Sequence, residues 1–233
     1  MISPVCGTGY NQRMGIPLSQ AALLLVDMQK ESRYGIEGLE AAVAATVPVL
    51  AACRAAGIPV VYTRHVGRAD GIGLSNAEVL DESGVPIYYR SDTDAVNVID
   101  EIAPHSQDIV IDKHRWSGFH ATSLDLMLRS LGVRHLIVGG FTTDCCVMTT
   151  VYDAYAHDYQ VHLVKDMCAA TNEGSHKSAV LMMANWVYDI EICGSTEVVK
   201  QLEGKPHGSW GSTAPDQKQF TAETLNDVYA SLG

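Results

Sequence analysis

The residues most suited to catalysis lie in the stretch from Leu136 to Asp153, which reads LIVGGFTTDCCVMTTVYD. An apolar run ends in two glycines and a Thr-Thr-Asp turn, after which apolar residues follow at helical spacing. A cysteine in the first turn of a helix lies near unpaired N–H groups and the positive end of the helix dipole, which favour the thiolate. The stretch therefore predicts a strand, a turn and a helix N-terminus with a candidate nucleophile, although free cysteines are also commonly buried for packing.

Two ionisable residues follow other strand-like runs. AALLLV (21–26) is continuously apolar, as is typical of a strand buried on both faces of a parallel sheet, and Asp27 comes directly after it. DIVID (108–112) is followed by Lys113. Ligands of parallel α/β sheets bind beyond the carboxyl ends of the strands, so we expect Asp27, Lys113 and Cys146 to converge there.

These three residue types are the ones that thiol catalysis requires: a nucleophile, a carboxylate that takes its proton and a cation that holds the charge. Taken alone, each has an ordinary structural explanation. Asp27 would be a helix N-cap and Lys113 a solvated strand end. The catalytic interpretation therefore depends on all three meeting at one edge of the sheet.

The elements expected around these residues alternate between strands and helices. Further strands are expected at 58–62, 135–138, 160–164 and 190–193, and helices at 38–56, 94–103, 123–131, 175–187 and 222–232. This alternation favours right-handed crossovers and a mostly parallel sheet with helices on both faces. The prediction is one Rossmann-like α/β domain over residues 1–233, in three α/β/α layers with a six-stranded sheet, an N-terminal arm (1–20) and a C-terminal tail (203–233).

The composition narrows the classes of partner. A formal net charge of −11, without any cluster of Lys and Arg, argues against nucleic acid and against an anionic membrane surface. No apolar run approaches the roughly 20 residues of a membrane-spanning helix, and the N-terminus lacks the pattern of a secretory signal. The six cysteines are scattered without a Cys-x-x-Cys pair, so we expect reduced thiols and a cytoplasmic protein.

Three segments carry a specific resemblance. They are LLLVDMQ (23–29), DKHRWSGFHATSLDLML (112–128) and GGFTTDCCVMTT with the DA that follows (139–154). In this order and spacing the chain resembles the isochorismatase-like hydrolase superfamily, in its cysteine-hydrolase branch. The nucleophile of that branch immediately precedes the valine of Thr-Asp-x-Cys-Val, which here is Cys146. Adjacent helix positions point about 100° apart, so Cys145 is expected in the core or behind the nucleophile.

The resemblance implies a six-stranded α/β sheet, a catalytic set of Asp27, Lys113 and Cys146, and no cofactor. It also implies a cis peptide between Phe141 and Thr142, with the N–H groups of Thr142 and Cys146 forming an oxyanion hole. The expected reaction is hydrolysis of a carbon–nitrogen bond in a small amide or a carbamoyl or ureido compound, through a thioester and with release of ammonia. Enzymes of this family commonly form homo-oligomers, so the resemblance implies a dimer or a tetramer.

One departure from the superfamily bears on metal binding. Nicotinamidases carry an Asp-x-His and further histidines after the second strand, whereas the matching stretch here is Tyr62-Thr63-Arg64-His65, with no carboxylate two residues before His65. We therefore expect no metal site and no nicotinamide substrate. The Arg-His pair instead resembles the carbamoyl and ureido hydrolases of the branch, including the ureidoacrylate and N-carbamoylsarcosine types.

Candidate substrate contacts flank these motifs. The connection 63–91 contains Gly67, Gly71, Gly73 and Gly84 and has the length of a lid or binding loop. An arginine would pair with a substrate carboxylate and a tryptophan would form an apolar wall, although an exposed arginine and a packing tryptophan are equally good explanations. The candidates are Gln29, His65, Tyr89, Arg90, Arg115 and Trp116.

Three other functions stay open. The same three catalytic residues would also open a cyclic amide or cleave another secondary amide, releasing an amine. A small-molecule-binding protein without catalysis is possible on the same scaffold, but it has no need of a complete Asp, Lys and Cys set. A dinucleotide-dependent oxidoreductase comes last, because no G-x-G-x-x-G follows the first strand.

Overall fold

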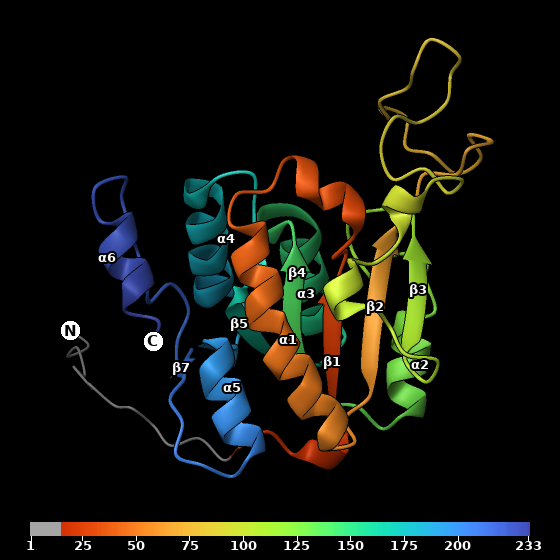
Figure 1. Ribbon diagram of the computed structural model, residues 1–233. Helices are drawn as coiled ribbons and strands as arrows, with labels where there is room; N and C mark the ends of the chain where they lie inside the picture. Colours follow the sequence, from red (N-terminus) through yellow and green to blue (C-terminus); the bar gives the residue numbers. More distant parts are fainter. Residues whose placement is uncertain (1–14) are drawn as a thin grey trace.

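A computed structural model describes residues 15–233 as one sheet covered by helices (Figure 1). The strands are β1 (Ala21–Val26), β2 (Val60–His65), β3 (Ile109–Lys113), β4 (His135–Phe141), β5 (Gln160–Ala169), β6 (Glu191–Cys193) and β7 (Trp210–Gly211). The helices are α1 (Leu39–Ala55), α2 (Leu124–Ser130), α3 (Met148–Ala156), α4 (Glu173–Trp186), α5 (Ser195–Leu202) and α6 (Leu225–Ala230). None of these helices is long and apolar enough to cross a membrane.

The strand order explains where a ligand would bind. The order is β3-β2-β1-β4-β5-β6-β7, with β1 to β6 parallel and β7 antiparallel to β6. The chain runs outward from β1 to β3 and then returns to β4 on the other side of β1. The strand order therefore reverses between β1 and β4, and the crevice at their carboxyl ends is where open α/β sheets bind ligands.

Both faces of the sheet are buried. The helices α1 and α5 cover one face, while α2, α3 and α4 cover the other and α6 packs outside α4 (Figure 1). Along β1, Leu23 and Leu25 pack into the core between the sheet and α1. Leu24 and Val26 pack into the core on the opposite face, beneath α2, α3 and α4. This two-sided burial is the physical reason for the uninterrupted apolar run of β1.

The predicted fold class is confirmed, with one more strand than expected. Residues 210–211 of the predicted tail pair with β6 and add the seventh strand. The helix expected at 94–103 is wrong: Val98 and Ile99 extend and pair with the backbone of 28–29, which leaves only two 3₁₀ turns, Asp94–Val96 and Asp100–Ile102. Helix α5 was not anticipated, and residues 1–14 of the predicted arm lie outside the described part of the chain.

The connection after β2 stands away from the body, beyond the carboxyl ends of β2 and β3 (Figure 1). We call residues 67–91 the projecting segment. Its two legs meet at its base, where Gly67 pairs with Arg90 and donates its N–H to the Tyr89 carbonyl at 2.8 Å. Farther out, Ile72, Val79 and Tyr88 are all more than half exposed. The base of this segment, rather than its tip, thus lies against the sheet.

Candidate active site

A buried ion pair lies at the carboxyl ends of β1 and β3. Asp27 directly follows β1 with a left-handed backbone (φ 52°), a conformation that Asp tolerates better than most residues. Lys113, the last residue of β3, is fully buried, and its Nζ lies 2.6 Å from Asp27 Oδ2. The same Nζ donates to the Arg115 carbonyl at 2.9 Å. A charged pair this deeply buried is costly to desolvate, which makes it a candidate functional feature.

Thr63 holds the other oxygen of Asp27 and was not among the predicted site residues. Its Oγ1 donates to Asp27 Oδ1 at 2.8 Å, and the side chain is fully buried in β2. Because side chains alternate along a strand, Thr63 and His65 share one face. That alternation was the one signal in the sequence that pointed to Thr63.

The candidate nucleophile lies on a π-helical turn, Thr143–Val147, between β4 and α3. Cys146 is buried, and the Phe141–Thr142 peptide bond just before the turn is cis, at the position the resemblance implies. The carbonyl of Thr142 accepts from the N–H groups of Cys145 and Val147, which flank Cys146. The turn is thereby tied to the end of β4.

A glycine allows β1 and β4 to approach closely beside this turn. Gly140 has φ 142°, and a Cβ there would lie 2.1 Å from the Val26 carbonyl oxygen. Only glycine fits this position without moving the backbone of β1. The close approach brings the residue that precedes Asp27 next to the strand that leads into Cys146.

The electrostatics of the turn favour a protonated thiol at rest. Interaction with the Cys145 thiol, burial and the negative charge of Asp27 raise the pKa of Cys146 well above its usual range, and Lys113 opposes them. Cys145 is half-buried, and its thiol lies against that of Cys146. Cys146 therefore needs a base to become a thiolate, and Asp27 is the carboxylate in electrostatic contact with it.

Three aromatic rings form a wall beside the ion pair. His65 is stacked on Trp116, with ring centroids 5.3 Å apart, and meets the edge of Tyr89 at 5.4 Å. The Tyr89 backbone is left-handed (φ 51°), and its N–H donates to Glu31 Oε2 at 3.1 Å. Burial raises the pKa of the Tyr89 hydroxyl to about 12, and the charges of Asp27 and Cys146 act on it as well. The structure thus brings three of the predicted substrate residues, His65, Tyr89 and Trp116, to one place.

The imidazole of His65 is expected to make the protein less stable in mild acid. Burial, followed by the charge of Lys113, lowers the His65 pKa from 6.5 to about 4. Between these two values the unfolded chain binds a proton that the folded one does not, so stability falls as the pH drops from 6.5 to 4, by up to about 3 kcal/mol. Urea unfolding of the wild type and of His65→Gln across this range measures the effect. Equal pH slopes for the two proteins would contradict it.

The other predicted substrate residues have different partners. The Gln29 side chain is fully buried and hydrogen-bonded to the backbone. Its amide nitrogen donates to the carbonyls of His65 (2.9 Å) and Val96 (2.7 Å). The Arg90 guanidinium pairs with Asp92 at 2.8 Å in the projecting segment. Arg115 Nη1 donates to the Gly73 carbonyl at 2.9 Å and so ties that segment to the residues after β3. Gln29 therefore positions His65 instead of meeting a substrate.

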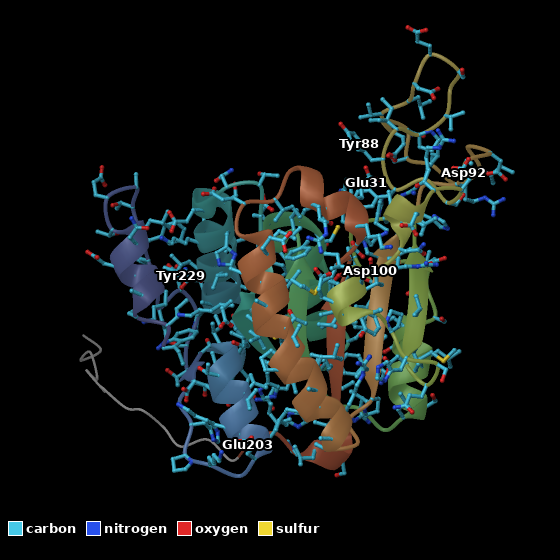
Figure 2. All side chains as sticks on the ribbon, viewed as in Figure 1. Glu31, Tyr88, Asp92, Asp100, Glu203 and Tyr229 are labelled. Carbon is cyan, nitrogen blue, oxygen red and sulfur yellow. The ribbon has the colours of Figure 1, made fainter. Side chains whose placement is uncertain are left out.

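A second hydrogen-bond chain leads away from the nucleophile turn. Thr143 Oγ1 and His176 Nδ1 are 2.8 Å apart, and His176 Nε2 lies 2.9 Å from the hydroxyl of Tyr229. Tyr229 belongs to α6 and faces α4 (Figure 2), and Lys165 lies over its ring, 4.9 Å from the centroid. The C-terminal helix is thus connected to the turn that carries Cys146.

Metal ligands are not assembled in the described part of the chain. Among residues 15–233, no group of three or more His, Cys, Asp and Glu side chains is placed to hold an ion. In the stretch that matches the Asp-x-His of nicotinamidases, Thr63 bonds Asp27 and His65 stacks on Trp116.

Comparison with known proteins places the chain in a family. A model of the isochorismatase domain matches residues 21–192. The ureidoacrylate amidohydrolase RutB of Yersinia enterocolitica is 32% identical over 208 residues, which cover 76% of this chain and 89% of the relative. The RutB of Pantoea ananatis is 33% identical over 196 residues, covering 72% and 77%.

Solved structures agree with this placement. A cysteine hydrolase from Pseudomonas syringae pv. phaseolicola superposes with a TM-score of 0.75 and 29% identity, covering 82% of this chain and 96% of that one. The N-carbamoylsarcosine amidase of Thermoplasma acidophilum gives 0.64 and 28%, covering 76% and 98%. The chain therefore belongs to the isochorismatase-like family, within its cysteine hydrolases.

Proposed function

We propose that this protein is a cysteine-dependent amidohydrolase that cleaves a carbon–nitrogen bond of a small amide, carbamoyl or ureido compound and releases ammonia. One observation carries the proposal: the buried Asp27–Lys113 pair stands in electrostatic contact with Cys146 at the reversal point of the sheet. The relatives named ureidoacrylate amidohydrolase and N-carbamoylsarcosine amidase support the choice of bond. Assembly into a dimer or tetramer and a cytoplasmic location stay predictions.

The proposed first half-reaction forms a thioester. Asp27 takes the proton of Cys146 Sγ, and the sulfur attacks the carbonyl carbon, forming a C–S bond and an oxyanion. The N–H groups of Thr142 and Cys146 are the proposed donors to that oxyanion. Asp27 then gives its proton to the departing nitrogen as the C–N bond breaks, and ammonia leaves.

The second half-reaction regenerates the enzyme. Asp27 takes a proton from water, the hydroxide adds to the thioester carbonyl, and the C–S bond breaks as Asp27 returns the proton to the sulfur, which regenerates the thiol. Lys113 lies within ion-pair distance of Asp27 and compensates the negative charge as that charge moves between Asp27 and sulfur. An amide yields a carboxylic acid, and a ureide yields a carbamate, which decomposes to an amine and carbon dioxide.

Ammonia release from a substrate panel tests the proposal. The panel holds N-carbamoyl amino acids, ureidoacrylate, biuret, maleamate and nicotinamide, with the Cys146→Ala protein as blank. We expect Cys146-dependent ammonia from at least one carbamoyl or ureido compound, and an acyl adduct on the Cys146 peptide by mass spectrometry. No ammonia from any of these compounds, together with Cys146-dependent turnover of a cyclic amide or of a secondary amide that releases an amine, would favour the alternative reaction instead.

Thr63→Val is expected to lower kcat/KM by about 10- to 100-fold without unfolding the protein. Valine keeps the shape of threonine but removes the hydrogen bond to Asp27 Oδ1, and a hydrogen bond to a charged group contributes about 1.5–3 kcal/mol. The matched control is Thr46→Val, because Thr46 is equally buried but bonds the Ala42 carbonyl within α1. Equal activity losses in the two variants would show that Thr63 acts only through packing.

A further inference from the structure

We propose that His65 selects ureides over plain amides, its Nδ1 accepting a hydrogen bond from the N–H that a ureide carries on the far side of the scissile carbonyl. This inference rests on the proposed amidohydrolase function. His65 would be the protein group that distinguishes a ureide, R–NH–CO–NH₂, from an amide of nearly the same shape, R–CH₂–CO–NH₂.

The first support is an unused polar atom. His65 is 8% exposed, and its Nδ1 is buried without a hydrogen-bond partner in the part of the chain that the structure describes. Buried polar atoms are nearly always paired, and an unpaired one is costly to the folded state. A bound substrate with a polar hydrogen at this place would remove that cost.

The second support is the direction in which the ring lies. His65 and Lys113 are register partners on adjacent parallel strands, so their side chains emerge on the same face of the sheet. Thr63, two residues before His65, also lies on that face and bonds Asp27. The imidazole therefore stands beside the ion pair that would flank the reacting carbonyl.

The third support is that the residue is held on every side. The Gln29 side chain accepts from the His65 N–H at 2.8 Å and donates to its carbonyl at 2.9 Å. Trp116 is stacked on the ring and Tyr89 meets it edge-on. A group fixed by its backbone and by both ring neighbours is preorganised for directional recognition, which a mobile surface histidine is not.

The acceptor role follows from the charge around the ring. A neutral imidazole has one N–H donor and one acceptor nitrogen. Lys113, Asp27, Glu78 and His114 are the charged or titratable groups that act on the ring, and the cation Lys113 is the strongest of them. A positive neighbour favours a neutral ring with an available lone pair, so we assign the acceptor role to the unpartnered Nδ1 and the hydrogen to Nε2.

A matched pair of substrates and a matched pair of variants test this assignment. N-carbamoylglycine and succinamate differ only in NH against CH₂ beside the carbonyl. In the wild type we expect kcat/KM, normalised by the uncatalysed hydrolysis rates of the two compounds, to favour N-carbamoylglycine by about 10-fold or more, the effect of one well-aligned hydrogen bond. His65→Asn places an amide oxygen near the position of Nδ1 and should keep that preference, whereas His65→Gln reaches the position of Nε2 and should reduce it to within about 3-fold.

The outcomes separate this inference from the proposed function. Ammonia release that depends on Cys146, with the same substrate ratio in the wild type and His65→Gln, would overturn the role of His65 alone. Loss of the preference in both variants would also overturn it, because Nδ1 would then not be the recognising atom. Absence of Cys146-dependent turnover on both compounds and on the whole substrate panel would overturn the proposed function and this inference together.

Discussion

Replacing Cys146 by alanine is expected to lower kcat by about 10⁴-fold or more and to leave the fold intact. The proposed pathway forms its only covalent bond through this sulfur, and loss of a nucleophile removes the pathway instead of weakening it. The Cys146 side chain is small, and it lies at the edge of a core in which Val147 and Val151 are fully buried, so deleting its sulfur creates little cavity. Ammonia release and urea unfolding measure the two effects separately.

The neighbouring cysteine supplies the control for this experiment. Cys145 lies against Cys146 and is half-buried, and its thiol contributes to the raised pKa of Cys146. Cys145→Ala should therefore leave kcat within several-fold of the wild type. If Cys146→Ala still turned over substrate, or if only Cys145→Ala lost activity, Cys146 would not be the nucleophile.

Lys113→Met is expected both to abolish activity and to destabilise the protein by about 3–5 kcal/mol. Lys113 is fully buried and Asp27 nearly so, and removing one member of a buried ion pair leaves the other charge without compensation. Methionine keeps most of the length and volume of the lysine stem, which limits the effect to the charge. Chemical denaturation monitored by tryptophan fluorescence gives the stability, and ammonia release gives the activity.

The double variant Asp27→Asn with Lys113→Met distinguishes the two losses. It removes both charges, so it should recover most of the stability that Lys113→Met loses, since an uncharged buried pair has no ion to desolvate. It should recover no activity, because neither the base nor the compensating cation is present. A double variant as unstable as the single one would show that the lysine acts through packing and not through charge.

Local patterns in the sequence were sufficient to predict much of the fold. The all-apolar run of β1 predicted a strand buried on two faces, and the glycine, turn and cysteine pattern predicted the β4–α3 junction, because burial and helix starts depend on neighbouring residues. The placement of Asp27 and Lys113 at strand ends also followed from pattern. Short or context-dependent elements did not: β7 is two residues long, and 94–103 is extended where it pairs with the chain near Gln29.

The partners of individual side chains were decided only by the tertiary structure. Gln29, Arg90 and Arg115 are polar residues near the motifs, and nothing local says that Gln29 is spent on the His65 backbone or that Arg115 binds Gly73. Thr63 became a site residue, and His65 an imidazole with an unused nitrogen, because three strands meet there in one register. The sequence by itself determined the long, strongly periodic elements and placed Asp27 and Lys113 at strand ends, since those features depend on short-range periodicity. Which atoms remain free for a substrate depends on contacts across 30 residues or more, and only the folded chain fixes those.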